Sequence, residues 1–448
     1  MRDIVLFLIV AGAVPVSLIQ PYIGVLAYSW VSYMNPHRLT YGFMYEFPIA
    51  MAIGAATGLG WLLVRERKSI PMTATTWLLV VFTLWCSFTT IFAIMPVEAQ
   101  SKLINFIKIM FMIFVTLSLM RTRERLQLLV WVIVISLGFY GIKTGLFTLM
   151  TGGGSRVYGP GGSMLEENNA FGVGMLMVIP LMRYLQMTTP SRWVFFGLAG
   201  AMVLTVVAVL ATYSRGALIG LAILAGYFWW QSRRKVVIGV LGAAVLAGGV
   251  AFMPDQWTDR MHTLETYEQD QSAQGRFDAW TFAYRIAVDR PITAGGFNAF
   301  MDGKTFLSYV PEAPTGRAAH SIYFEVLGEH GFIGLALFLA IGFTTLRNGR
   351  WVSRMTRGHP ELDRARSLGA MMQVSVAGYA ASGAFLTLAF FDLFYHLVAI
   401  SVLNRWLTRQ ELSSQVKELG HNTMISPAAG VPALAGTRVS FLRGKQGH

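Results

Sequence analysis

Apolar runs of about membrane length recur along most of the chain. A helix rises about 1.5 Å per residue, so roughly 20 apolar residues cross a hydrocarbon core of about 30 Å. The pattern predicts segments at 4–19, 21–33, 43–64, 76–95, 103–120, 125–149, 169–186, 192–212, 216–231, 236–253, 321–346, 369–389 and 391–407. The second is short, and Pro15 and Pro21 interrupt its neighbourhood. We therefore predict twelve spans, thirteen at most.

Composition agrees with this pattern. The 448 residues are 54% hydrophobic and 13% charged, about half the charged fraction of a soluble domain. The sequence therefore predicts an all-α polytopic membrane protein surrounded by membrane lipids. A net charge of +13 in such a protein indicates cytoplasmic loops and no nucleic-acid partner. The single cysteine, Cys86, excludes an intramolecular disulfide.

Lys and Arg in short loops predict the orientation of the spans. The loops at 65–68, 121–125, 233–235 and 347–366 are basic and fall on one side, together with the C-terminus. An excess of these residues marks the cytoplasmic side. The opposite, periplasmic side then holds the loop 151–168 and the longest loop, 254–320.

These assignments divide the chain into four parts. They are an N-terminal transmembrane bundle (1–253), a large periplasmic loop subdomain (254–320), C-terminal transmembrane helices (321–410) and a cytoplasmic tail (411–448). Residues 421–448 of this tail are rich in Pro, Gly and Ala, which predicts disorder. Between Arg276 and Arg290 four large apolar residues follow helical spacing and predict an amphipathic helix: Phe277, Trp280, Tyr284 and Val288.

His320 stands where the large loop meets the apolar run from Ile322. An imidazole with a pKa near 6.5 can accept a proton from a hydroxyl at neutral pH, which makes His320 a candidate general base. A histidine that only caps a helix or lies at the membrane interface would give the same sequence.

Arginines on the same side are candidate anion ligands. Arg215 stands at the outer end of a membrane segment, and Arg276 begins the predicted amphipathic helix. A guanidinium group matches phosphate oxygens with two parallel hydrogen bonds. Snorkelling to the interface and simple solvation are the alternatives. Weaker candidates of the same kind are Arg285, Arg290 and Arg317.

The loop from Gly152 to Asn169 is rich in glycine, which allows close approach of the backbone to a ligand. No strand precedes it, so it is not a nucleotide-binding fingerprint. A flexible connector is the alternative. Further candidate substrate contacts in or near this loop are Arg156, Asn168, Asn169 and Tyr213.

Other chemistries leave no motif in the sequence. It contains no Walker lysine motif, HExxH, cysteine cluster or G-x-S-x-G, so we predict no metal site and no cofactor. Asp392 and His396, at i and i+4, are the best pair for a proton-coupled transporter. Such a pair can equally satisfy itself between helices.

The motifs in their order resemble a known family over about residues 1–410. His320-Ser321, nine further residues and Gly331-x-x-Gly334 resemble the signature of bacterial O-antigen ligases, whose superfamily includes O-antigen polymerases and protein O-oligosaccharyltransferases. The segment 214–217 resembles the arginine motif of that family. Gly275-Arg276 with Trp280 resembles the arginine-bearing part of its periplasmic loop. The segments 20–24 and 34–37 resemble a subgroup of O-glycosylation ligases associated with exosortase systems.

The resemblance implies a metal-independent membrane glycosyltransferase of the C type. Such an enzyme moves a glycan from undecaprenyl diphosphate to a hydroxyl on the periplasmic face, which for ligases belongs to lipid A–core. The family's catalytic histidine corresponds to His320, and its diphosphate-binding arginines to Arg215 and Arg276, with Arg285 and Arg290 nearby. No candidate nucleophilic carboxylate is evident, so we expect inversion. A protein acceptor, a polymerase, and a transporter of lipid-linked glycan are the alternatives.

Overall fold

The computed structural model describes residues 1–65, 69–231, 234–252 and 271–425, and every regular element in these ranges is helical. The long helices are α1 (Arg2–Ile19), α2 (Pro21–Met34), α3 (Ile49–Leu63), α4 (Ala74–Ile91), α5 (Pro96–Leu119), α6 (Arg123–Met150), α7 (Asn168–Thr188), α8 (Arg192–Ala211), α9 (Arg215–Gln231), α10 (Lys235–Phe252), α12 (Gln271–Asp289), α14 (Ile322–Met355), α15 (Asp363–Gly383) and α16 (Asp392–Ile425). The short ones are η1 (Pro36–Leu39), η3 (Ala299–Met301), α13 (Gly303–Tyr309) and η4 (Pro360–Leu362).

The described helices include seven that are long and apolar enough to cross a membrane, namely α1, α4, α5, α6, α7, α8 and α14. This confirms the polytopic membrane character, while the count of twelve spans stays a prediction. Each of the thirteen predicted segments overlaps a helix, although the segment 43–64 begins six residues before α3. The break after α1 is a single residue, Gln20, because Pro21 takes the first position of α2.

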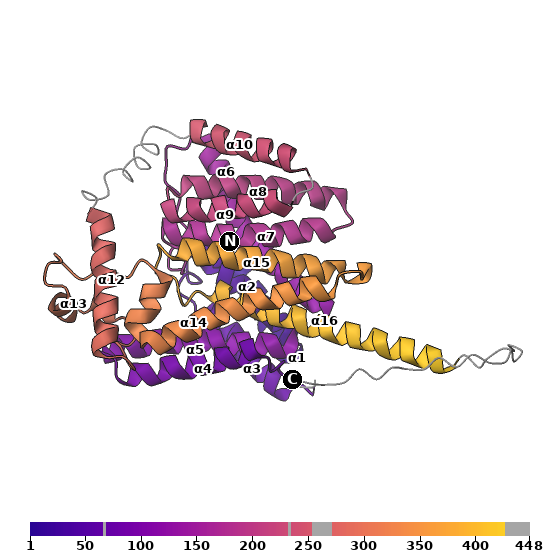
Figure 1. Ribbon diagram of the computed structural model, residues 1–448, viewed down its shortest axis with the longest axis horizontal. Coiled ribbons are helices and arrows are strands. Elements are labelled where there is room, and N and C mark those ends of the chain that lie inside the picture. Colours follow the sequence, from indigo (N-terminus) through magenta and orange to yellow (C-terminus); the bar gives the residue numbers. More distant parts are fainter. Residues whose placement is uncertain (66–68, 232–233, 253–270, 426–448) are drawn as a thin grey trace, which may run out of the picture. The chain divides into compact units, whose positions relative to one another are not determined.

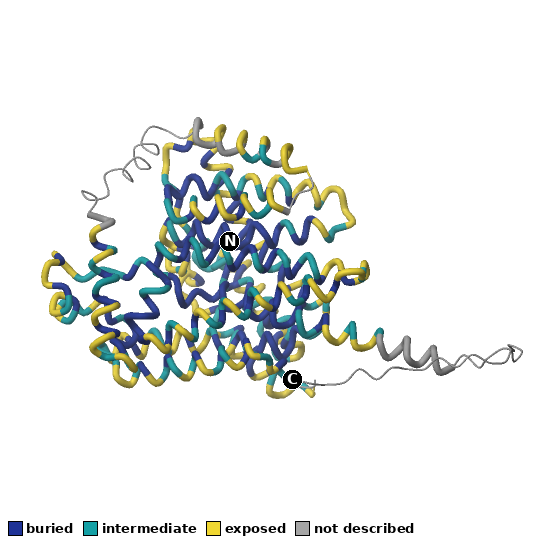
Figure 2. Tube along the Cα trace, viewed as in Figure 1, coloured by how far each residue is buried: buried dark blue, intermediate teal, exposed yellow. Residues whose placement is uncertain are grey.

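Apolar side chains cover much of the outside of the bundle. Ile4 and Leu8 on α1 are 57% and 63% exposed, and Trp193 on α8 is 77% exposed. Figure 2 shows buried residues toward the interior of the helix bundle and exposed residues along its outer helix faces. Soluble proteins rarely expose contiguous apolar surface of this extent, whereas lipid acyl chains cover it without cost.

Residues Met1–Thr408 form one compact unit, and α7 is the most buried of its seven candidate membrane spans. It packs on α6, α8, α9 and α15, and the long helices of this unit run roughly side by side (Figure 1). Small residues allow the closest contacts: a Cβ on Gly172 would lie 2.9 Å from the Cβ of Ala217 on α9. Tight apposition of backbones is the usual means of association between membrane helices.

The described part of the large loop, from Gln271 onward, has an apolar cluster of its own. The predicted helix is confirmed as α12, which runs across the direction of the long helices (Figure 1). Its predicted apolar face is wrong, however, because Phe277, Tyr284 and Val288 are exposed. The buried face consists of smaller residues together with Phe282: Ala279, Ala283, Ile286 and Ala287. Small side chains there let α12 pack closely on α14.

Two membrane helices depart from the predicted outline. The chain within α14 breaks at Gly331, whose φ of +70° is non-helical, so the predicted Gly331-x-x-Gly334 spacing marks a kink. A side chain at Gly331 would also lie 2.9 Å from the carbonyl oxygen of Pro291. Helix α16 continues to Ile425, so residues 411–425 are helical where a tail was expected. Residues 426–448 lie outside the described ranges, and the predicted four-part division stays a prediction.

The predicted segment 369–389 overruns its helix. Helix α15 ends at Gly383, and residues 384–391 form a non-helical connection to α16. Non-helical backbone at membrane depth needs partners inside the protein. The backbone N–H of Ala389 donates to Glu325 Oε2 at 2.9 Å, and the hydroxyl groups of Tyr379 and Tyr395 donate to the carbonyls of Leu388 and Ala389 at 2.8 and 3.0 Å.

Candidate functional site

His320 is held by its backbone at the entrance to α14. Its φ of +44° lies in the left-handed region, which is uncommon for residues other than glycine, although Asn, Asp and His enter it more often than most. Its N–H donates to Thr387 Oγ1 at 2.8 Å, which joins the end of the large loop to the 384–391 connection. The surrounding structure thus fixes an unfavourable conformation at this one residue.

Trp280 of α12 fixes the residues just before His320. Its indole Nε1–H donates to the carbonyl of Ala319 at 2.9 Å. Its ring stacks on Phe324 of α14, with centroids 4.9 Å apart and planes 9° from parallel. The Trp280 side chain therefore links α12, the loop end and α14. A displacement of α12 would shift the backbone next to His320.

Charged groups from two separate loops act on His320. Burial lowers the pKa of its imidazole, and the positive charges of Arg276 and Arg317 lower it further, while the carboxylate of Glu167 opposes them. A lowered pKa keeps the imidazole neutral, and so able to accept a proton, at neutral pH. The loops 151–168 and 254–320, predicted on the same side, thus meet around His320.

Arg317 lies directly against the start of α12. A Cβ added to Gly275 would stand 2.6 Å from both Cδ and Nη1 of Arg317, so the end of the Arg317 side chain would have to move for a larger residue at this position. This contact places Arg317 beside the residue that precedes Arg276. Arg317 and Arg276, both candidates from the sequence, therefore flank the same stretch of backbone.

Arg215 opens α9 after a tight turn. In this turn Tyr213 has a φ of +56°, and Ser214 Oγ accepts a hydrogen bond from the N–H of Ala217 at 3.2 Å. A Cβ on Gly216 would lie 3.3 Å from Phe385, two residues before the Thr387 that bonds His320. Arg215 and His320 therefore approach the 384–391 connection from different helices. Arg215 is not among the charges that shift the pKa of His320.

The glycine-rich loop is docked on this turn. The N–H of Val157 donates to the carbonyl of Ala211 at 3.0 Å, and the hydroxyl of Tyr213 donates to the carbonyl of Gly153 at 2.8 Å. The guanidinium of Arg156 lies 5.6 Å from the centre of the Tyr213 ring. These contacts place the loop beside Arg215, so it is more than a connector in this structure.

Two asparagines begin α7 after that loop. Asn168 Nδ2 donates to the carbonyl of Thr212 at 2.7 Å and is buried, which makes it a support of the turn before Arg215. Asn169 is half-buried. The buried hydrogen bond of Asn168 therefore gives this residue a structural role.

The remaining two arginine candidates are engaged elsewhere. Arg285 Nη1 donates to the carbonyl of Tyr309, and Arg290 Nη2 donates to the carbonyl of Phe92 at 2.6 Å. Arg285 lies nine residues beyond Arg276 on α12, a rise of about 14 Å, and Arg290 directly follows the end of that helix. Only Arg276 of these three acts on His320.

An ionic cluster beside the site escaped the sequence reasoning. Lys102 Nζ of α5 lies 3.1 Å from Glu325 Oε1 and 2.9 Å from Glu329 Oε1, both on α14. The two carboxylates are almost fully buried, while the lysine side chain is 25% exposed. Its ammonium also lies 5.3 and 5.0 Å from the ring centres of Phe297 and Phe390. We call these three charged residues the Lys102 cluster.

The Lys102 cluster also holds backbone that leads to the site. Glu329 Oε1 accepts a hydrogen bond from the N–H of Asn298 at 2.9 Å, and Glu325 Oε2 accepts one from Ala389. Ala389 is two residues from Thr387. Glu325 and Glu329 stand out in the sequence as polar residues in an apolar run, but nothing there shows that Lys102, more than 200 residues earlier, is their partner.

Asp392 and His396 on α16 form hydrogen-bond contacts with residues of α2. Ser32 Oγ donates to Asp392 Oδ2, and the Tyr33 hydroxyl is 2.7 Å from His396 Nδ1. Each member of the pair thus has a partner on another helix. This arrangement favours the structural interpretation of the pair over a transport path.

Comparison with protein families gives two matches. Residues 200–339 match the family described as O-antigen ligase, and this range includes Arg215, Arg276 and His320. Residues 1–189 match a family of unknown function, DUF5935. No curated protein matches the chain. Within the described ranges, no three His, Cys, Asp or Glu side chains converge as metal ligands would.

Proposed function

Because residues 200–339 place this chain in the O-antigen ligase-like superfamily, we propose that it is a membrane glycosyltransferase of the C type. In this proposal it transfers a glycan from undecaprenyl diphosphate to a hydroxyl group of lipid A–core on the periplasmic face of the inner membrane. The observation that carries the proposal is the setting of His320, between backbone that fixes it and the arginines of α12 and the loop end.

His320 is proposed as the general base. The acceptor oxygen forms a bond to the anomeric carbon while its proton passes to the imidazole. The bond from that carbon to the diphosphate breaks, and its electron pair leaves with the lipid diphosphate. Attack opposite the leaving group inverts the anomeric centre. A lowered pKa suits this role, because the imidazole must be neutral before it accepts the proton.

Arg215 and Arg276 are proposed to bind the diphosphate. Negative charge grows on the phosphate oxygens as the glycosidic bond breaks, and fixed cations stabilise that charge most when they need no reorganisation. Arg276 neighbours His320 electrostatically, and Arg215 stands at the N-terminus of α9, where helix geometry also favours an anion. In this arrangement no step requires a metal ion.

Backbone strain supports the same location. Five described non-glycine residues have a positive φ, and two of them are asparagines, which tolerate it. Of the other three, His320 is the proposed base and Tyr213 lies two residues before the proposed ligand Arg215. Conformations of this kind cost about 1–3 kcal/mol each and concentrate at functional sites.

Transfer by the purified protein from a lipid-linked glycan donor tests the proposal. We expect His320→Ala to lower kcat by about 10²–10⁴-fold, the usual contribution of a general base. Arg276→Ala should weaken donor use, whereas Arg285→Ala, the matched control on the same helix, should not. Near-normal transfer by the His320 variant, with correct insertion, would sink the assignment of the base.

The same assay separates the possible acceptors. A protein O-oligosaccharyltransferase and an O-antigen polymerase would share the donor and the residues above, and would differ only in the hydroxyl that attacks. Comparison of lipid A–core with a candidate protein acceptor decides between them. A transporter of lipid-linked glycan would release no lipid diphosphate in either reaction.

A further inference from the structure

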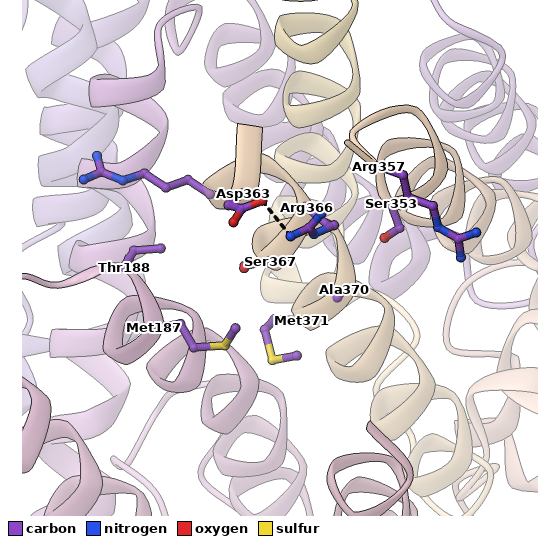
Figure 3. Close-up of a pocket in the computed structure, with 10 residues that line it drawn as sticks. Met187, Thr188, Ser353, Arg357, Asp363, Arg366, Ser367, Ala370 and Met371 are labelled. Carbon is purple, nitrogen blue, oxygen red and sulfur yellow. Dashed lines mark hydrogen bonds and ion pairs between the residues drawn. The ribbon is translucent and has the colours of Figure 1, made fainter. Parts of the chain in front are cut away.

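A polar hollow lies at the end of the helices opposite to His320. It is lined where α7 ends, where α14 ends and where α15 begins, and its volume is about 560 Å³ (Figure 3). Helix α14 has 34 residues, so its two ends are separated by up to about 50 Å. The hollow is therefore distinct from the site around His320.

The lining of the hollow is basic on one part and apolar on another. It contains the arginines Arg357, Arg364 and Arg366, the hydroxyl residues Thr188, Ser353 and Ser367, and a single acid, Asp363. Asp363 already pairs with Arg366 at 2.6 Å, which Figure 3 marks. Met187 and Met371 lie next to each other along one side of the hollow (Figure 3).

Two positive charges in the lining are not neutralised by the described part of the protein. Neither Arg357 nor Arg364 makes a side-chain hydrogen bond or ion pair with another residue in these ranges. No side chain caps the N-terminus of α15 beside them, at Asp363. Guanidinium groups, hydroxyl groups and a helix start together match the oxygens of a phosphate group.

We propose that this hollow binds the phosphate headgroup of an anionic phospholipid. Its position favours a lipid over a soluble phosphate, because three long helices have a terminus there, and membrane helices commonly end near lipid headgroups. Met187, Ala370 and Met371 give the apolar wall that the glycerol and first acyl carbons need. A hollow of this size between helices accommodates a ligand of that class.

The neighbouring surface of α14 is also basic, but the described residues that line its hollow include no hydroxyl side chain. A second hollow, of about 510 Å³, is lined by Arg347, Arg350 and Arg354 together with Phe343, Leu346 and Trp351. Arginines at cytoplasmic helix ends follow from membrane topology alone. Membrane topology therefore explains the arginines of both hollows, but it does not explain the combination of hydroxyl groups and an apolar wall in the first hollow.

Binding of short-chain phosphatidylglycerol to the full-length protein in neutral detergent tests the proposal, with short-chain phosphatidylcholine as the neutral lipid. The test variant is Arg357→Gln with Arg364→Gln. The control variant is Arg350→Gln with Arg354→Gln, which removes the same charge at the same end of α14. We expect the test variant to lose at least about tenfold in affinity for phosphatidylglycerol. The control should change by less than about threefold.

Three results would overturn the proposal. Equal losses in both variants would show a diffuse basic surface. Equal affinity of the unmodified protein for both lipids would show no headgroup recognition. Inorganic phosphate that binds as tightly as phosphatidylglycerol would assign the hollow to a soluble anion. Labelling of the buried Cys86 thiol on heating checks that both variants are folded.

Discussion

Replacement of Lys102 by methionine should destabilise the protein strongly. Methionine keeps most of the volume and the unbranched shape of the side chain but removes the ammonium group. Glu325 and Glu329 would then face each other with side chains only 4% and 3% exposed, without the cation that now lies about 3 Å from each. Breaking a buried ion pair from one side costs about 3–5 kcal/mol, because the partner stays buried and uncompensated.

Thermal labelling of the single cysteine measures this loss of stability. Cys86 is fully buried on α4, and its carbonyl accepts a hydrogen bond from Thr89, whose hydroxyl lies 2.7 Å from His330 Nδ1 beside the Lys102 cluster. A thiol-reactive dye therefore reports when this region opens. At about 2 °C per kcal/mol, the low end of the usual range, the midpoint of thermal labelling should fall by about 6–10 °C.

Two further variants isolate the charge from the packing. Lys108→Met changes an exposed lysine on the same helix and should shift stability by no more than about 0.5 kcal/mol. Lys102→Met combined with Glu325→Gln and Glu329→Gln removes all three charges and keeps the amide oxygens as acceptors. This triple variant should recover most of the loss. A triple variant no more stable than Lys102→Met alone would refute the electrostatic explanation.

Three other predictions concern the proposed reaction. Because a general base must be neutral, the rate at saturating donor rises with pH through the pKa of His320. Arg276→Gln should move that rise to higher pH, and Glu167→Gln should move it to lower pH. A shift in the same direction in both variants, or no shift, would refute His320 as the titrating group. Trp280→Phe keeps the ring stack but loses the hydrogen bond to Ala319; it should lower kcat about fivefold with unchanged KM for the donor, and a change in KM alone would contradict the positioning role. A chelator should leave transfer unchanged, and inhibition that Mg²⁺ or Mn²⁺ reverses would contradict a metal-independent mechanism.

Local patterns made the helices predictable. Runs of about 20 apolar residues must form helices in lipid, since every backbone group needs a partner within the segment. This constraint acts on each run separately, so the sequence located all thirteen helical segments. Pro21 likewise marked a real helix boundary, because the conformational preference of proline is local.

The 384–391 connection could not be found in this way. Its residues are almost all apolar and read as a continuation of α15. Its backbone is non-helical because distant groups, such as Glu325 and Tyr379, supply the hydrogen bonds that a helix would otherwise provide. The sequence contains these partners but not their proximity. The same limitation hid Thr387, which bonds the backbone of His320.

The sequence by itself determined the helical membrane architecture, the histidine at the mouth of α14 and a short set of candidate arginines, because residue type and spacing are enough for these. Only the tertiary structure gave a physical reason to prefer Arg276 in the proposal: Arg276 lies within electrostatic reach of His320, whereas Arg285 on the same helix and Arg290 just after it donate to carbonyl groups elsewhere. It also paired Lys102 with two carboxylates more than 200 residues away. Charge acts through distance in space, and the sequence gives only distance along the chain.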